Sequence, residues 1–148
     1  MKAVFDTNIF VSALAIPGGQ AERAFDLVIE GRVNLWISKE IIHEVLGVLA
    51  QKFSKEPEEL ARTAVFLSEL GELVVPRKKL ADLEDEPDNR ILECAVIGHV
   101  DIIVTGDRAM LDLKKYQEVR ILSLRRFLDE ISTPDPCAKP LSNRIPRR

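Results

Sequence analysis

Four acidic residues stand where a folded chain of this kind would gather carboxylates for chemistry. They are Asp6, Glu44, Asp88 and Asp107. Three of them lie at the end or the beginning of a predicted strand or helix, and Glu44 lies on the helix after the second predicted strand. The carboxyl ends of parallel strands and the first turns of the following helices share one edge of a sheet. We therefore expect the four side chains to line one pocket.

A cluster of this kind indicates a divalent cation. Crowded carboxylates repel one another, and one or more takes up a proton unless a cation neutralises them. Mg²⁺ and Mn²⁺ bind through a few carboxylates together with waters and substrate phosphates. Such a site can polarise a phosphodiester, generate hydroxide from water and stabilise the leaving oxygen.

A zinc site is not favoured by the sequence. His43 and His99 are isolated from one another, and the chain has no Cys-x-x-Cys motif. We expect His43 to point to solvent. His99 is expected to end a helix, where a histidine suits the helix dipole.

Each acid also has a purely structural interpretation. Aspartate is a favoured N-cap, so Asp6, Asp107 and either Asp85 or Asp88 could simply cap the helices that they precede. Glu44 could be a solvated helix residue. Those interpretations would require four coincidences at one edge of the sheet, and the joint pattern favours a site.

Short apolar runs alternate with amphipathic segments along the chain. Strands are predicted at residues 3–5, 34–37, 73–75, 101–105 and 119–122. Helices are predicted directly after Asp6 and at residues 21–31, 38–53, 56–71, 88–98 and 124–131. A further short helix is predicted to follow the turn at Gly106 and Asp107 and to end at about Leu113. This alternation predicts an α/β fold with a five-stranded parallel sheet and helices on both faces. The polar segment 77–86 is predicted to be a mobile connector. Trp36 is expected in the core.

Composition indicates one soluble domain, residues 1–132, followed by a basic tail, residues 133–148. Apolar residues make up 46% and charged residues 30% of the chain, which is ordinary for globular proteins. No apolar run approaches the roughly 18 residues of a membrane span, and no signal peptide is evident. Cys94 and Cys137 lie far apart, which fits a reducing cytoplasm better than a disulfide framework.

The net charge of −3 argues against attraction of nucleic acid by the whole surface. The charge is uneven, because four basic residues against Asp135 make the tail +3 and leave −6 for the rest. The tail contains several prolines and is predicted to be irregular.

The ordered acidic stretches resemble the PIN-domain family, and within it the VapC-like toxins of prokaryotic toxin–antitoxin systems. The matching stretches are residues 4–12, Glu44 in its helix, residues 85–89 with 92–95, and residues 103–107. The resemblance spans residues 2 to about 131. It implies a three-layer α/β/α sandwich and, as in many PIN domains, a ribonuclease that depends on Mg²⁺ or Mn²⁺.

The resemblance carries the family's catalytic, metal-binding acids over to Asp6, Glu44, Asp88 and Asp107. Asp88 is preferred to Asp85 because Asn89 and the stretch 92–95 follow it at the family's spacing. Residues that would hold the acids and their waters in place are Thr7, Asn8, Ser12, Asn89 and Thr105. Asp112 is a further acid near the site, and Glu93 is a weaker candidate.

The sequence therefore predicts a metal-dependent endoribonuclease, the toxin of a type II toxin–antitoxin pair. Its partners would be an RNA substrate, a cognate antitoxin that blocks the acids, and a second copy of the chain. Arg23 and Arg108 are candidates for contacts with RNA phosphates. The basic run 77–79 is more simply a solvated surface.

Two other functions remain open at this point. A phosphatase of the haloacid dehalogenase type would need a second aspartate two residues after Asp6, where this chain has Asn8. A non-catalytic RNA-binding or assembly module on the same fold would not need metal. The complete set of four acids speaks against that module.

Overall fold

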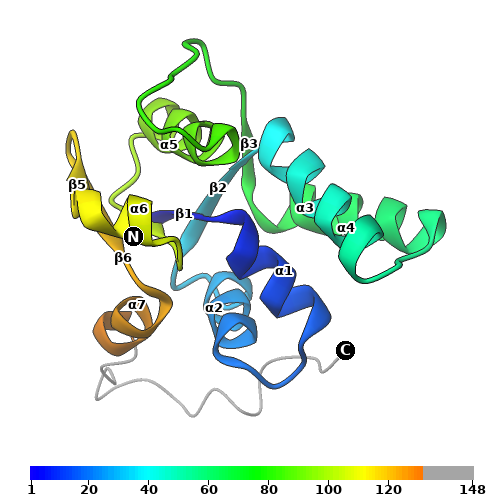
Figure 1. The fold of residues 1–148 in the computed structure, drawn as a ribbon. Coiled ribbons are helices and arrows are strands. Elements are labelled where there is room, and N and C mark those ends of the chain that lie inside the picture. Colours follow the sequence, from blue (N-terminus) through cyan, green and yellow to red (C-terminus); the bar gives the residue numbers. More distant parts are fainter. Residues whose placement is uncertain (132–148) are drawn as a thin grey trace.

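The computed structural model describes residues 1–131, so the predicted basic tail 133–148 and Cys137 lie outside the described residues. The described chain alternates strands and helices (Figure 1). The strands are β1 (Lys2–Phe5), β2 (Asn34–Ser38), β3 (Glu72–Val74), β4 (Ile102–Val104), β5 (Lys115–Tyr116) and β6 (Val119–Leu122). The helices are α1 (Thr7–Ala15), α2 (Gln20–Ile29), α3 (Lys39–Lys52), α4 (Pro57–Leu70), α5 (Glu86–Gly98), α6 (Arg108–Leu113) and α7 (Leu124–Ile131).

The strands form one sheet in the order β3-β2-β1-β4-β6-β5. β1 lies in its middle, with Lys2 opposite Asn34 of β2 and Phe5 opposite Val104 of β4. These pairings are parallel, as predicted, and so are β2 with β3 and β4 with β6.

The prediction of five strands is corrected to six, because β5 pairs antiparallel with β6. β5 consists of only Lys115 and Tyr116, which have no apolar pattern that the sequence could reveal. It joins β6 through a turn in which Gln117 has a φ of 53°.

Helices cover both faces of the sheet, which confirms the α/β/α sandwich (Figure 1). α5 packs across β1, β2, β3 and β4 on one face, while α1, α2 and α7 lie on the other. Phe5 of β1 anchors the core on that second side, with its ring centroid 5.8 Å from that of Phe10 and 5.7 Å from that of Phe127. The central strand is therefore fixed by packing right up to the residue before Asp6.

The end of α5 approaches β2 very closely at Gly98. A Cβ atom at Gly98 would lie 2.5 Å from Cδ1 of Trp36, so only glycine allows this approach. Trp36 is half-buried against the core, and Lys2 Nζ lies 4.7 Å from its ring centroid. His99 then ends the helix, as the sequence predicted, and its backbone is in a left-handed conformation. His43 is exposed, also as predicted.

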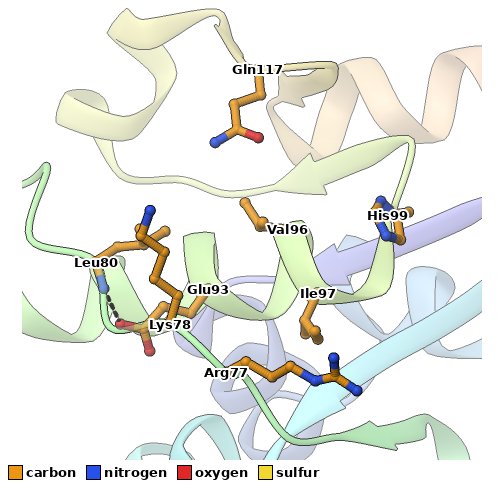
Figure 2. A pocket seen from close by; sticks show the side chains of 8 residues that line it. All are labelled: Arg77, Lys78, Leu80, Glu93, Val96, Ile97, His99 and Gln117. Carbon is orange, nitrogen blue, oxygen red and sulfur yellow. Dashed lines mark hydrogen bonds between the residues drawn. The ribbon is translucent and has the colours of Figure 1, made fainter.

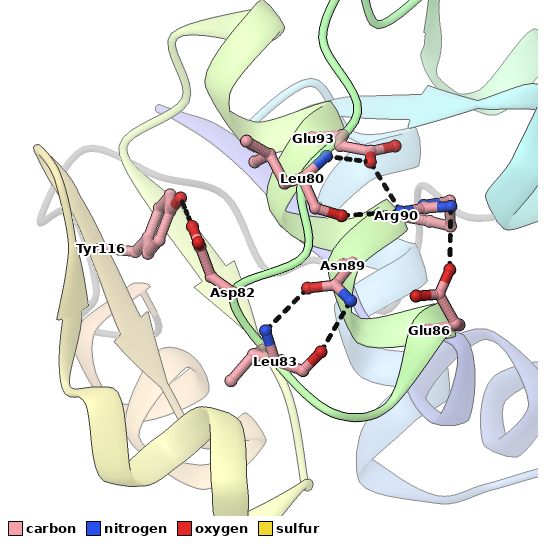
Figure 3. Close-up of polar contacts among 8 residues, drawn as sticks. All are labelled: Leu80, Asp82, Leu83, Glu86, Asn89, Arg90, Glu93 and Tyr116. Atoms are coloured by element: carbon pink, nitrogen blue, oxygen red, sulfur yellow. Dashed lines mark hydrogen bonds and ion pairs between the residues drawn. The ribbon is translucent and has the colours of Figure 1, made fainter.

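The connector between β3 and α5 is tied to the helix that follows it (Figure 3). The Asn89 side chain accepts a 2.9 Å hydrogen bond from the backbone N–H of Leu83 and donates a 2.8 Å bond to its carbonyl. The backbone N–H of Leu80 donates to Glu93 at 2.7 Å, and Arg90 donates to the Leu80 carbonyl at 3.0 Å. The segment predicted to be mobile is thus anchored by polar side chains of α5.

A further contact joins the connector to the β5–β6 hairpin, since the Tyr116 hydroxyl donates a hydrogen bond to Asp82 (Figure 3).

None of the helices formed by residues 1–131 has the length and apolar character that crossing a bilayer requires.

Candidate active site

Asp6 lies at the carboxyl end of β1, and its side chain is almost fully buried, with 4% exposed. Its backbone N–H donates to the carbonyl of Val104 on β4 at 2.9 Å, which fixes the two strand ends side by side. The Thr105 hydroxyl donates a 2.6 Å hydrogen bond to Oδ2 of Asp6 and accepts a 3.0 Å bond from the backbone N–H of Asp107. One hydroxyl group therefore links the acids that follow β1 and β4.

The two acids differ in how they relate to their helices. Asp6 occupies the N-cap position of α1, but its side chain makes no capping hydrogen bond. The Asp107 side chain does cap α6, because its Oδ2 accepts a 3.0 Å hydrogen bond from the backbone N–H of Met110. Capping alone thus accounts for the position of Asp107 but not for that of Asp6.

Asp88 brings a third carboxylate to this place from the first turn of α5. It is 5% exposed. Burial and the charges of Asp6, Asp107 and Asp85 raise the pKa of Asp88 to about 7, and a hydrogen bond between Asp88 and Asp107 also favours its protonated form.

The electrostatics of Asp6 are similar. Burial raises the pKa of Asp6, and the charges of Asp107 and Asp85 add to that increase. Hydrogen bonds from the Thr105 hydroxyl and the Thr7 backbone act in the opposite direction. The neighbouring charges that act on Asp6 and Asp88 are all negative, so no positive side chain of residues 1–131 offsets the repulsion between these carboxylates.

Asp85 contributes to this repulsion from the N-cap position of α5, although it is exposed. Because its charge raises the pKa of both Asp6 and Asp88, it is an additional member of the acidic group. Asp85 and Asp88, which the sequence left in competition, therefore both lie here. We call Asp6, Asp85, Asp88 and Asp107 the acidic cluster.

Glu44 is half-buried on α3 and lines an adjoining pocket of about 160 Å³. The other lining residues are Thr7, Glu40, Ile41, Glu86, Pro87 and Arg90. Thr7 follows Asp6 and Pro87 precedes Asp88, so this pocket borders the acidic cluster. The charges that raise the pKa of Asp6 and Asp88 come from other members of the cluster. Glu44 is not among them and lines the adjoining pocket instead.

The residues predicted to support the site lie in several places. Thr105 binds Asp6 directly, whereas Asn89 holds the backbone of Leu83. Glu93 is engaged elsewhere, since it forms a 2.8 Å ion pair with Arg90. On α1, Asn8 is exposed and Ser12 is half-buried, and Asp112 is exposed on α6.

The two arginines expected near RNA also differ in position. Arg108 is exposed and directly follows Asp107, while Arg23 is half-buried on α2. The basic run is exposed, and Arg77 and Lys78 line a separate pocket of about 260 Å³ (Figure 2). That pocket follows the C-terminal half of α5, from Glu93 to His99, whereas the acids stand at the N-terminal end of the helix.

Sequence reasoning missed the polar network that sets the start of α5. Arg90 pairs with Glu86 at 3.3 Å and with Glu93 at 2.8 Å. The spacings i,i+4 and i,i+3 on one helix were the available signal. The Tyr116–Asp82 contact had no such signal, because the two residues are 34 positions apart.

The donor atoms of the acidic cluster suit a hard divalent cation. All are carboxylate oxygens, which Mg²⁺ and Mn²⁺ prefer. Within residues 1–131, no three Asp, Glu, His or Cys side chains already stand in a metal-binding arrangement. The carboxylates are gathered and would have to reorient around an ion, and the repulsion that raises their pKa values would then be relieved.

Comparisons with known proteins agree with this architecture. The family model of the PIN domain matches residues 2–109. The uncharacterized protein MJ1680 of Methanocaldococcus jannaschii is 26% identical over 138 residues, which cover 90% of this chain and 87% of that protein.

A solved structure shares the fold. It is a chain of VapBC2 from Rickettsia felis, crystallised bound to a DNA fragment from their promoter. It superimposes with a TM-score of 0.60 at 16% identity, over 83% of this chain and 98% of that chain. The match of the family model over most of the sequence, together with the sheet order and the acids at its edge, shows that the chain belongs to the PIN-domain family.

Proposed function

We propose that this protein is a Mg²⁺- or Mn²⁺-dependent endoribonuclease and the toxin of a type II toxin–antitoxin pair. The observation that carries the proposal is the acidic cluster, in which Asp6 at the end of β1 and Asp88 in the first turn of α5 are buried and, within the described part of the chain, only negative charges act on them. Membership of the PIN-domain family supports a nuclease, and the fold shared with a VapBC2 chain supports the toxin assignment.

Asp6, Asp88 and Asp107 are the proposed metal ligands and catalytic acids, and Glu44 joins them from the adjoining pocket. A divalent ion bound there supplies a Lewis acid and lowers the pKa of a bound water. Thr105 orients Asp6 and keeps its carboxylate available. Because burial and neighbouring charges raise the pKa of Asp88 to about 7, this carboxyl is partly protonated at neutral pH in the free protein, and a bound cation would favour loss of that proton.

Thr7, Asn8, Ser12, Asn89 and Asp112 remain proposed supports of the acids and their waters. Arg108 stands beside Asp107, where it would contact a phosphate of the RNA, and Arg23 is a more distant candidate. Phosphate contacts of this type set affinity but not sequence choice.

The proposed setting is the cytoplasm, with an antitoxin that covers the acidic cluster and a homodimer as the assembly. The complex from Rickettsia felis contains VapB and VapC together, which supports a protein partner for this chain. A basic or polar segment would suit the acidic cluster by charge.

Cleavage of mixed single-stranded RNA by the purified chain tests the function. Reactions with Mg²⁺, with Mn²⁺ and with EDTA would be compared for the wild type, Asp6→Asn and Asp107→Asn. Asp129→Asn, an exposed position on α7, is the matched control. We expect metal-dependent cleavage that both cluster variants abolish and the control retains.

Cleavage that survives both cluster variants would contradict the site. If no RNA is cut, calorimetric titration with Mn²⁺ separates the alternatives. Binding that Asp6→Asn removes would support the metal site and a strict RNA specificity, whereas absence of binding would favour a non-catalytic module.

A further inference from the structure

A second cavity lies close to the acidic cluster and has the opposite charge. It measures about 460 Å³ and lies between α6, β6 and the start of α7. Lys114, Arg120 and Arg126 line it together with Ser123 and the apolar residues Leu111 and Leu122. None of the described residues that line it is acidic. We call it the cationic cavity.

Backbone hydrogen bonds show how near this cavity is to the acids. The N–H of Thr105 donates to the carbonyl of Leu122 at 3.0 Å, so one wall is the strand next to the residue that binds Asp6. The N–H of Leu111 donates to the carbonyl of Asp107 at 2.9 Å, so another wall begins one helical turn after Asp107. Neighbouring strands and successive helical turns are each about 5 Å apart, so both walls lie about that distance from Thr105 and Asp107.

The charges of the cavity are only partly compensated inside the protein. Arg120 binds Glu130 through two contacts, at 2.8 and 3.2 Å, and Arg126 also acts on the charge of Glu130. Lys114 takes part in none of the ion pairs found within residues 1–131. The part of the lining that the structure describes therefore contains three cations and no carboxylate, which leaves an excess of positive charge at the wall of the cavity.

The backbone holds Lys114 in a defined place. Its φ is 60°, an uncommon value for a lysine. Its N–H donates to the carbonyl of Leu111 and its carbonyl accepts from the N–H of Ile121, both at 3.0 Å. The base of this side chain is thus fixed between α6 and β6, at the wall of the cavity.

The two cavities that flank the acidic cluster have opposite character. The one that contains Glu44 also has Glu40 and Glu86 in its wall, and its single arginine is already paired with Glu86 and Glu93. A polyanion is repelled on that side and attracted on the side of Lys114 and Arg126. This asymmetry gives a strand bound at the acids one favourable direction.

We propose that single-stranded RNA runs from the acidic cluster into the cationic cavity, where Lys114 and Arg126 bind backbone phosphates next to the cleaved bond. The inference rests on the proposed ribonuclease function and adds a substrate-binding site and a direction for the strand. Such contacts give affinity that falls with salt, because each neutralised phosphate releases counterions. They place the strand without reading its sequence.

Binding can be measured without catalysis. Fluorescence anisotropy of an end-labelled single-stranded RNA would be recorded in EDTA between about 50 and 200 mM salt. The test variant is Lys114→Gln with Arg126→Gln. The matched control is Lys115→Gln with Arg125→Gln, which removes two exposed charges next in sequence that do not line the cavity.

We expect the test variant to bind RNA about tenfold more weakly or worse. The slope of log K against log salt should fall by about 1.4, which is about 0.7 for each lost phosphate contact. The control should keep both quantities. Circular dichroism of the two variants would confirm equal folding. With metal added, the KM of the test variant for RNA should rise while kcat stays near that of the wild type.

Wild-type affinity and slope in the test variant would overturn the inference, as would a wild type that shows no salt-dependent RNA binding. A labelled poly-glutamate peptide is the second probe. If the test variant lost affinity for that peptide but not for RNA, the cavity would belong to an acidic protein partner and the RNA site would be refuted. Because binding is read without metal, failure of the ribonuclease function appears separately, as metal-dependent cleavage that never occurs.

Discussion

The hydroxyl of Thr105 donates a 2.6 Å hydrogen bond to Oδ2 of Asp6 across a sequence separation of 99 residues. The same oxygen accepts the backbone N–H of Asp107 at 3.0 Å. An ionised carboxylate can only accept hydrogen bonds, so the single proton of the hydroxyl is donated to Asp6 while its oxygen accepts from Asp107. This donor stabilises the ionised form of a carboxylate that burial and the charges of Asp107 and Asp85 push towards protonation.

Replacement of Thr105 by valine should therefore impair activity more than stability. The loss of the hydrogen bond should raise the pKa of Asp6, so the ionised form that the proposed metal site requires would appear only at higher pH. We expect cleavage to fall by about 10- to 100-fold and the acid limb of the pH–rate profile to move to higher pH. Thr105→Ser keeps the hydroxyl and should restore the profile. An unchanged profile in the valine variant would contradict the role of the hydrogen bond.

The raised pKa of Asp88 predicts an unusual dependence of stability on pH in metal-free protein. Its value rises from 3.8 to about 7 on folding, so the folded state holds a proton that the unfolded state releases between these values. The free energy of unfolding should accordingly decrease as the pH rises from about 4 to 7 through this group. Asp88→Asn removes the charge and should raise Tm at pH 8 by about 3 °C, which corresponds to roughly 1 kcal/mol in a domain of this size.

Thermal unfolding followed by circular dichroism at pH 5 and pH 8 measures this effect. The Glu118→Gln substitution, at an exposed position between β5 and β6, is the control and should change Tm little at either pH. Equal Tm values for Asp88→Asn and the wild type at pH 8 would show that repulsion within the acidic cluster does not destabilise the folded state.

The connector should become accessible to protease when Asn89 is replaced by alanine. The substitution removes two hydrogen bonds to the backbone of Leu83, each worth about 1 kcal/mol. Trypsin should then cut faster within the basic run 77–79, as followed by mass spectrometry of the fragments. Asn34→Ala, at an exposed position of β2, should leave the rate unchanged. Equal cleavage rates in both variants would show that the other anchors suffice.

Two glycine-to-alanine substitutions should have opposite effects on stability. Gly98→Ala places a Cβ atom 2.5 Å from the rigid Trp36 ring, and such overpacking costs about 1–3 kcal/mol. Gly47→Ala, in the middle of α3, meets nothing within 4 Å and should stabilise the protein by up to about 1 kcal/mol. Urea unfolding followed by the fluorescence of Trp36 measures both. A neutral Gly98→Ala would mean that α5 can move away from β2.

The sequence predicted the parallel sheet and the approach of Asp6 to Asp107, because Asp6 directly follows one buried apolar strand and Asp107 comes three residues after the end of another. It left Asp85 and Asp88 in competition, since their separation depends on how the connector enters α5. That entry is set by side chains of the helix, such as Asn89 and Arg90, which contact a segment without any periodic pattern. The pairing of β5 with β6 could not be predicted either, because the two residues of β5 have no apolar pattern that indicates a strand.

The fold also has a consequence in time. β1 lies between β2 and β4, and its second neighbour is made about a hundred residues after it. On a ribosome, the first three strands can assemble while Asp6 still lacks Thr105 and Asp107. At about 5 to 20 residues per second, roughly 5 to 20 seconds separate the synthesis of Asp6 from that of Asp107. The acids of the proposed nuclease site therefore come together only after most of the chain has been synthesised.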